Sequence, residues 1–179
     1  DAATTLLALN RLWGLRWPRE RLLTLAATLG ADVPFFVGGR NAFVEGIGER
    51  LTPIVLPRAC YAVVKPPAAL PTPAIFSSPL LKRDTEAVIV TGSFADAPNP
   101  GAAIGGWVDR FMGGFGRNDL QPVAEGRCDE VVQAAAWLHA RYGNSRMTGS
   151  GSAVFARAGS GDQPVATFPA DALPPGWVG

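Results

Sequence analysis

Hydrophobic positions recur at helical spacing in the first thirty residues. Leucines three apart fall on one stripe of a helix predicted over residues 3–13, and Gly14 stands where helices commonly end. A second helix is predicted over residues 18–29, because a proline suits its first position and Gly30 suits its end. The short link between the two predicts an antiparallel helical hairpin.

Shorter apolar segments follow, with the character of strands. Strands are predicted at residues 42–45 and 51–56, joined through two glycines, and a more apolar strand at residues 61–65. Pro57 is a candidate domain boundary. Residues 66–100 are rich in proline and small side chains, which predicts a loop with one short helical turn.

Helical spacing returns in the second half of the chain. A glycine-broken helix is predicted over residues 101–113 and a firmer helix over residues 121–142. The glycine-rich loop at residues 146–152 then leads into a strand at residues 153–158, and a last weak strand is predicted at residues 165–168. The pattern by itself predicts a mixed α and β fold.

An acidic residue lies just after the second predicted helix. Pro34 biases Val33 toward an extended conformation, so residues 30–36 are predicted to form a loop. Asp32 is held on this loop, where a carboxylate can accept or orient a hydroxyl proton. From the spacing alone, a turn or capping aspartate is the favoured interpretation.

Composition and charge narrow the class of protein. The 179 residues are 47% hydrophobic and 17% charged, which is typical of one sizeable folded domain or two small ones. The net charge is +1 without a basic run, which argues against nucleic acid as a partner. Apolar stretches are broken well before the ~18 residues of a membrane-spanning helix, so a soluble protein without a membrane partner is expected.

The few reactive side chains exclude several chemistries. Cys60 and Cys128 form neither a CxxC pair nor a disulfide framework, which fits a reducing, cytoplasmic compartment. His139 is the only histidine and lies in a helical run, which argues against a histidine metal site or a serine hydrolase triad. The chain opens without a start methionine or signal-peptide pattern, so a fragment is expected.

Three further features are candidates for ligand binding. The glycines and hydroxyls of residues 148–152 could form an anion-binding nest, although the segment matches neither the P-loop nor the dinucleotide fingerprint. Asp1 opens a helix whose N-terminus favours a phosphate, with simple N-capping as the alternative. Phe76 lies in a proline-rich loop, either as part of the core or as a stacking platform for a base.

Several blocks of the sequence, taken together, resemble the GHMP kinase superfamily. In matching order and spacing they are Asp1–Leu6, Leu29–Phe36, Glu45–Pro53, Pro71–Phe76, Asn118–Gln121 and Arg146–Phe155. The similarity is to the branch that acts on a cytidine diphosphate methylerythritol, and it spans residues 1 to about 158. The resemblance implies an α+β, two-lobed architecture. An incomplete N-terminal nucleotide-binding lobe would occupy residues 1–57, and a C-terminal lobe, a sheet backed by helices, residues 58–179.

The resemblance also implies a reaction. It is the ATP-dependent phosphorylation of the 2-hydroxyl of 4-diphosphocytidyl-2-C-methyl-D-erythritol, in non-mevalonate isoprenoid precursor synthesis. Asp32 matches the family's catalytic aspartate, which would take or orient the hydroxyl proton as the γ-phosphoryl group arrives. With the resemblance, this role becomes the favoured one for Asp32. The implied cofactors are ATP and Mg²⁺; no metal ligand is assigned, and the oligomeric state is left open.

The nucleotide is expected to contact two motifs. Asp1 and Ala2 match the end of the family's glycine-rich phosphate loop, where a turn and a helix N-terminus hold ATP. Gly149, Ser150 and Gly151 match the third motif of the superfamily. Both motifs are therefore expected to bind ATP.

The small-molecule substrate is expected to contact a third set. Ile47, Thr72 and Phe76 match positions lining the family's substrate pocket, and Phe76 is expected near the cytosine ring. The chain departs from the family at its start, because most of the phosphate loop and the segment with the catalytic lysine do not precede Asp1. Lys65 and Lys82 are the only lysines and neither occupies that motif. The 179 residues alone are therefore expected to be inactive.

Two alternatives stay open. Another GHMP kinase, of the homoserine or mevalonate type, would share the motifs but would not bind cytidine diphosphate compounds. A non-catalytic binding domain could keep the fold without the chemistry, as the absent lysine would permit.

Overall fold

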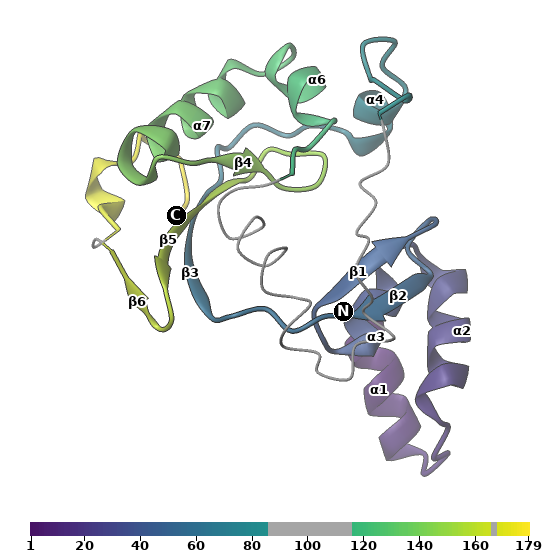
Figure 1. Cartoon of the computed structure of the whole chain (residues 1–179). Helices are drawn as coiled ribbons and strands as arrows, with labels where there is room; N and C mark the ends of the chain where they lie inside the picture. Colours follow the sequence, from purple (N-terminus) through teal and green to yellow (C-terminus); the bar gives the residue numbers. More distant parts are fainter. Residues whose placement is uncertain (86–115, 166–167) are drawn as a thin grey trace. The chain divides into compact units, whose positions relative to one another are not determined.

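The computed structural model describes residues 1–85, 116–165 and 168–179, and Figure 1 shows its elements coloured along the sequence. The described chain divides into two compact units, which we call unit 1 (residues 1–56) and unit 2 (the described residues from Pro57 onward). The helix predicted over residues 101–113 falls outside the described residues.

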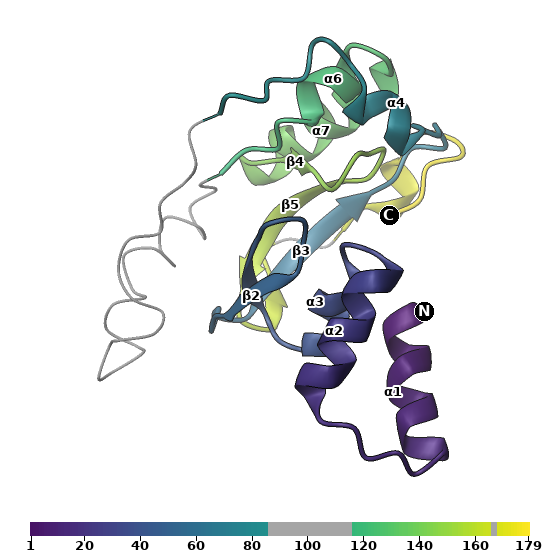
Figure 2. The same ribbon diagram turned by 90° about the vertical axis from the view of Figure 1, so that its right-hand side faces the viewer.

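Unit 1 joins a cluster of helices to a β-hairpin. Its elements are α1 (Ala2–Leu12), α2 (Arg19–Leu29), α3 (Val33–Gly38), β1 (Ala42–Glu45) and β2 (Arg50–Pro53). Helices α1 and α2 lie side by side as the predicted hairpin in both views (Figures 1 and 2). The strands pair antiparallel. A small apolar core forms where the helices meet, from the buried side chains of Ala3, Leu22, Ala26 and Val37.

Two local predictions in unit 1 were wrong. Where a loop with an extended Val33 was predicted, α3 begins at Val33. Pro34 is tolerated there because it occupies the first turn, where backbone N–H groups have no partner within the helix. Tertiary packing favours this arrangement, since Pro34 is buried and Val33 packs against the apolar core. The second predicted strand starts one residue earlier than expected and ends at Pro53.

Unit 2 is an antiparallel sheet with helices on one face. Strands β3 (Ala59–Val64), β5 (Val154–Ser160) and β4 (Arg146–Met147) are neighbours in that order, and β6 (Gln163–Pro164) pairs with β5. The remaining described elements are α4 (Thr72–Phe76), α6 (Gln121–Glu125), α7 (Asp129–Tyr142) and a 3-10 turn at Ala170–Ala172. The predicted sheet backed by helices is thus confirmed, as is the short helical turn, which is α4.

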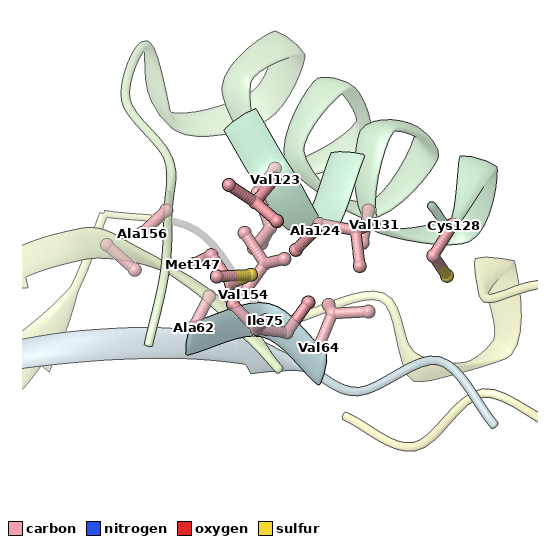
Figure 3. Close-up of a cluster of buried hydrophobic side chains, with 13 residues drawn as sticks. Ala62, Val64, Ile75, Val123, Ala124, Cys128, Val131, Met147, Val154 and Ala156 are labelled. Atoms are coloured by element: carbon pink, nitrogen blue, oxygen red, sulfur yellow. The ribbon is translucent and has the colours of Figure 1, made fainter. Parts of the chain in front are cut away.

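The core of unit 2 lies between the sheet and its helices. Figure 3 shows side chains from both layers meeting there: Val64 and Val154 from the strands, Ile75 from α4, Val123 from α6 and Val131 from α7. All five are 2% exposed or less. This burial fixes α4 and α6 against the sheet, and with them the loops that begin and end at these helices.

The single continuous helix predicted over residues 121–142 is instead two helices. The chain leaves α6 at Gly126 and passes through an extended Cys128 before α7 begins. Glycine is a poor helix former, whereas Asp129 and Glu130 suit a helix N-terminus, where acidic side chains offset the helix dipole. Periodicity alone did not show this break.

Two more predictions need correction. The loop predicted at residues 146–152 starts with β4, which pairs with β5. The last weak strand lies earlier than residues 165–168, at Gln163–Pro164, and Val165 N–H then donates to the carbonyl of Ala158 at 2.6 Å. Within the described residues, no helix has the length and apolar character needed to cross a membrane.

Candidate active site

Asp32 lies at the start of α3, and its side chain does not cap the helix. It occupies the N-cap position, yet its carboxylate makes no capping hydrogen bond and the residue is exposed. The backbone around it is ordered by a turn in which Val33 N–H donates to the Gly30 carbonyl at 3.2 Å. The backbone at Asp32 is therefore held in place, while the carboxylate is not used to cap α3 and is free to contact a ligand.

The turn between β1 and β2 lies against the segment that carries Asp32. A Cβ added to Gly48 would stand 2.0 Å from the carbonyl oxygen of Ala31, so the two backbones touch directly. Ile47 belongs to the same turn and is 78% exposed. The structure thus brings two of the sequence-predicted positions, Asp32 and Ile47, onto neighbouring segments of unit 1.

Glu49 holds this turn in shape. Its carboxylate accepts the backbone N–H of Ile47 at 2.7 Å. Hydrogen bonds from the backbone N–H groups of Glu49 itself and of Ile47 keep the pKa of the Glu49 carboxyl below its usual value. The ionised form is therefore the one that fits the turn.

Asp1 and Ala2 open α1, and both are exposed. The carbonyl of Asp1 accepts the N–H of Thr5 at 2.9 Å, while its side chain makes no capping hydrogen bond. The next residue, Ala3, is buried in the apolar core of unit 1, which α3 also joins through Val37. The start of α1 and the start of α3 thus belong to the same packed cluster of helices.

The glycine-rich segment 148–152 joins β4 to β5 in unit 2, and its two glycines differ. Gly149 has φ +56°, and apart from its chain neighbours no atom of the described residues lies within 4 Å of where a Cβ would stand, so its surroundings there are open. Gly151 has φ +95°, and a Cβ there would lie 2.9 Å from both Leu70 Cδ1 and Met147 Sδ. One side of the loop is therefore packed and the other is available for a ligand.

Two sequence-predicted residues meet at this loop. The hydroxyl oxygens of Thr72 and Ser150 lie 2.8 Å apart, and either can donate. Thr72 is the first residue of α4, and Phe76 is its last, with half of its surface exposed. The structure thus groups a predicted nucleotide residue with two predicted substrate residues on one side of unit 2.

Asn118 belongs to a block that resembles the family, but the sequence did not single it out as a site residue. Its amide nitrogen donates to the carbonyls of Met147, at 2.9 Å, and of Gly149, at 2.7 Å. Its amide oxygen accepts the N–H of Leu120 at 3.0 Å. One side chain therefore links the approach to α6 with the glycine-rich loop. The available signal was its position in a short block that resembles the family.

Ser152 is a second residue that the sequence did not single out. It is 3% exposed, and its hydroxyl lies 2.7 Å from the carbonyl oxygen of Ala68 and 3.2 Å from that of Pro66. Gln121 adds a bond on the other side, because its side-chain oxygen accepts the N–H of Met147 at 2.9 Å. The loop is thereby anchored on both sides by side-chain hydrogen bonds.

Unit 2 also contains a hollow of about 780 Å³. It is lined by residues from α7, β5 and neighbouring segments, among them His139, Tyr142 and Arg157. None of the predicted site residues lines it. Across the residues that the structure describes, no group of three or more His, Cys, Asp or Glu side chains is placed to hold a metal ion.

Comparison with known protein families identifies the class. The model of the GHMP kinases N terminal domain matches residues 1–40, and the model of the GHMP kinases C terminal region matches residues 102–166. The two matches together cover more than half of the 179 residues. The chain belongs to the GHMP kinase family, which consists of ATP-dependent small-molecule kinases. The predicted family and its mixed α and β fold are thus confirmed.

Individual relatives sharpen the comparison. The 4-diphosphocytidyl-2-C-methyl-D-erythritol kinase of Methylibium petroleiphilum is 59% identical over 180 residues, covering 100% of this chain and 58% of the relative. The kinase of the same name from Variovorax paradoxus is 51% identical over 182 residues, covering 99% of this chain and 59% of the relative. The chain therefore spans a little under three fifths of the length of these relatives.

A solved structure of a kinase with the same name is also similar to this chain. The crystal structure of a 4-(cytidine 5'-diphospho)-2C-methyl-D-erythritol kinase matches with a TM-score of 0.62 and 33% sequence identity. The match covers 90% of this chain and 55% of that one. The structural match is thus to a protein of the same name as the sequence relatives.

Proposed function

We propose that the protein containing this chain uses ATP to phosphorylate the 2-hydroxyl of 4-diphosphocytidyl-2-C-methyl-D-erythritol, a step of non-mevalonate isoprenoid precursor synthesis. The observation that carries the proposal is the exposed carboxylate of Asp32, placed at the start of α3 without a capping bond. The substrate class is supported by the names of the relatives, which share about half or more of their aligned residues with this chain.

Asp32 is proposed to act on the hydroxyl that is phosphorylated. Its carboxylate accepts or orients the hydroxyl proton while the oxygen attacks the γ-phosphorus of ATP. The bond from the γ-phosphorus to its bridging oxygen breaks as the new bond forms, and ADP leaves. The proton removed from the hydroxyl passes to the carboxylate or to water, so charge and atoms balance.

The phosphates of ATP are proposed to contact backbone N–H groups in two places. The helix start at Asp1 and Ala2 favours an anion through its dipole and its unpaired N–H groups. Gly149, Ser150 and Gly151 supply a loop whose open side, at Gly149, admits a ligand close to the backbone. Mg²⁺ enters bound to ATP, as part of the substrate.

The cytidine substrate is proposed to contact Ile47, Thr72 and Phe76. The half-exposed ring of Phe76 offers a face for stacking on cytosine. The hydroxyl of Thr72 is already hydrogen-bonded to Ser150, so this position couples the substrate residues to the glycine-rich loop. Ile47 adds exposed apolar surface in unit 1.

The deciding experiment is an ADP-release assay on the complete reading frame that contains these 179 residues, with Mg-ATP and the cytidine substrate. Asp32→Asn keeps the size of the side chain but removes its basicity, so kcat is expected to fall by about 10²-fold or more. Asp171→Asn, at an exposed aspartate in the Ala170–Ala172 turn, is the matched control and is expected to leave turnover unchanged.

Each other result has a defined meaning. A folded Asp32→Asn variant with wild-type turnover would remove Asp32 from the mechanism. Turnover of homoserine or mevalonate in place of the cytidine compound would move the protein to another GHMP kinase. Binding of the cytidine compound without ADP release would indicate a non-catalytic binding domain.

A further inference from the structure

We propose that the turn at residues 46–49, between β1 and β2, is a positioning element that sets where Asp32 stands. The inference rests on the proposed function and extends it to residues that do not touch the reacting atoms. Three independent features of unit 1 support it: a backbone contact, an internal brace of the turn, and the anchoring of α3 at its far end.

The first feature is the contact between Gly48 and Ala31. A Cβ at Gly48 would lie 2.0 Å from the carbonyl oxygen of Ala31 and 2.8 Å from its carbonyl carbon. Real Cβ atoms do not approach other atoms so closely, so only glycine fits. The φ of +119° at Gly48 also favours glycine. Because Ala31 and Asp32 share a peptide plane, pushing on this carbonyl moves the backbone of Asp32.

The second feature is the brace inside the turn. Glu49 accepts the N–H of Ile47 at 2.7 Å, and the N–H of Gly48 donates to the Glu45 carbonyl at 3.3 Å. A Cβ at Gly46 would stand 2.2 Å from the Glu49 carboxylate, so the carboxylate lies tightly over the turn. These hydrogen bonds hold the turn in one conformation, so that Gly48 contacts Ala31 at a defined position.

The third feature fixes α3 at its other end. The guanidinium of Arg19 donates to the carbonyl of Val37 at 3.0 Å and also to that of Gly38. Gly38 faces Leu51 of β2, whose Cδ1 would lie 3.4 Å from an added Cβ. With the C-terminal end of α3 tied to α2 and β2, the contact at Gly48 holds the segment before its N-terminal end. The helix that begins beside Asp32 is thus constrained at both ends.

The test compares Gly48→Ala with Gly14→Ala in the complete reading frame. Gly14 also lies in unit 1 with a positive φ of +63°, but beyond its chain neighbours no atom in the described part of the chain lies within 4 Å of where its Cβ would stand. It therefore imposes backbone strain without a steric contact. We expect Gly48→Ala to lower kcat by about 10²-fold, because a shift of about 1 Å in a reacting group has that effect. KM for ATP stays close to the wild-type value, and Gly14→Ala keeps the wild-type kcat.

A second measurement does not depend on turnover. Amide hydrogen exchange of peptides covering residues 30–36 is expected to be faster in Gly48→Ala than in Gly14→Ala, while exchange in α2 is equal in the two variants. If Gly48→Ala does not fold, Glu49→Gln replaces it, because that change weakens the brace without adding a clash. It is expected to lower kcat several-fold and to speed exchange in the same peptides.

The outcomes separate this inference from the proposed function. Gly48→Ala turnover and exchange equal to those of Gly14→Ala would overturn the inference, as would a raised KM with kcat unchanged. If Glu49→Gln is the variant used, wild-type kcat and exchange would overturn it in the same way. A wild-type protein that turns over none of the substrates contradicts the proposed function instead, and equal exchange at residues 30–36 would then still overturn the positioning role of the turn.

Discussion

The segment carrying Asp32 in unit 1 and the glycine-rich loop of unit 2 are held by opposite means. Around Asp32, backbone lies directly on backbone, with Gly48 against Ala31 and no side chain between them. Around residues 148–152, side-chain hydrogen bonds tie the loop and the adjoining β4 to distant segments. Asn118 donates to Met147 and Gly149, and Gln121 accepts from Met147. The hydroxyl of Ser152 donates to the carbonyl of Ala68, and that of Ser150 pairs with Thr72. The segment with Asp32 depends on Gly48 having no side chain, whereas the glycine-rich loop depends on polar side chains that donate or accept hydrogen bonds.

This difference determines which changes each site tolerates. A contact made by packing is damaged by adding a methyl group, because interiors are dense and the backbone cannot move aside. A contact made by hydrogen bonds is damaged by removing a donor or acceptor, because its partner is then left unsatisfied. The two sites therefore respond to different substitutions, and the following predictions test this.

The largest loss of stability is expected at Gly151, the one glycine of the unit 2 loop that is also packed closely against other side chains. Gly151→Ala adds a Cβ 2.9 Å from Leu70 and Met147 at a φ of +95°, and is expected to lower the free energy of unfolding by about 3 kcal/mol. Gly149→Ala, with φ +56° and open surroundings, is expected to cost about 1 kcal/mol. Denaturant unfolding monitored in unit 2 measures both. Equal costs would show that packing at Gly151 does not hold the loop.

A somewhat smaller effect is expected for the hydrogen-bonded anchor. Asn118→Ala removes the donors to Met147 and Gly149 and the acceptor for Leu120, and is expected to cost about 2 kcal/mol. Asn118→Asp retains the acceptor but places a carboxylate against two carbonyls, so it is not expected to restore stability. The same unfolding experiment, with hydrogen exchange of residues 146–152, provides the measurement. Recovery by the aspartate would mean that the bond to Leu120 is the important one.

The smallest effect is a pH dependence in unit 1. Backbone N–H groups lower the pKa of Glu49 in the folded protein from the ordinary value of 4.5, so the ionised form adds stability above that pH. That stability is lost as the pH falls through the lowered pKa. Protection of residues 46–49 from exchange, relative to the intrinsic rate at each pH, is therefore expected to fall below pH 4.5 in the wild type. It is expected to fall less in Glu49→Gln, which lacks the titrating group. An identical fall in both would assign the effect to other carboxylates.

Much of the fold could be predicted from local pattern. The helical hairpin of α1 and α2, the strands around Ala42–Glu45 and Ala59–Val64, and the short helix in the proline-rich segment all follow from periodicity and from the placement of glycine and proline. The family blocks led to the candidate positions Asp32, Thr72 and Ser150. Two of these, Thr72 and Ser150, are side by side in unit 2 although 78 residues separate them.

What local pattern could not show depends on partners distant in sequence. A proline after Val33 disfavours a helix locally, and only burial of Pro34 in unit 1 makes α3 form there. The break at Gly126 was likewise hidden by the apolar spacing on both sides of it. Asn118 could not be singled out, because its partners Met147 and Gly149 lie about thirty residues further along the chain.

The amino-acid sequence by itself determined the family, the mixed α and β character and the types of chemical group at the candidate site, because these follow from residue identity and from short spacings. The tertiary structure alone decided that Gly48 touches the segment carrying Asp32, that Asn118 and Ser152 anchor the glycine-rich loop, and that its open side is at Gly149. These features are contacts between segments far apart in the chain. Such contacts form only when burial of the two apolar cores brings those segments together. Local propensity depends on neighbouring residues alone and therefore cannot predict these contacts.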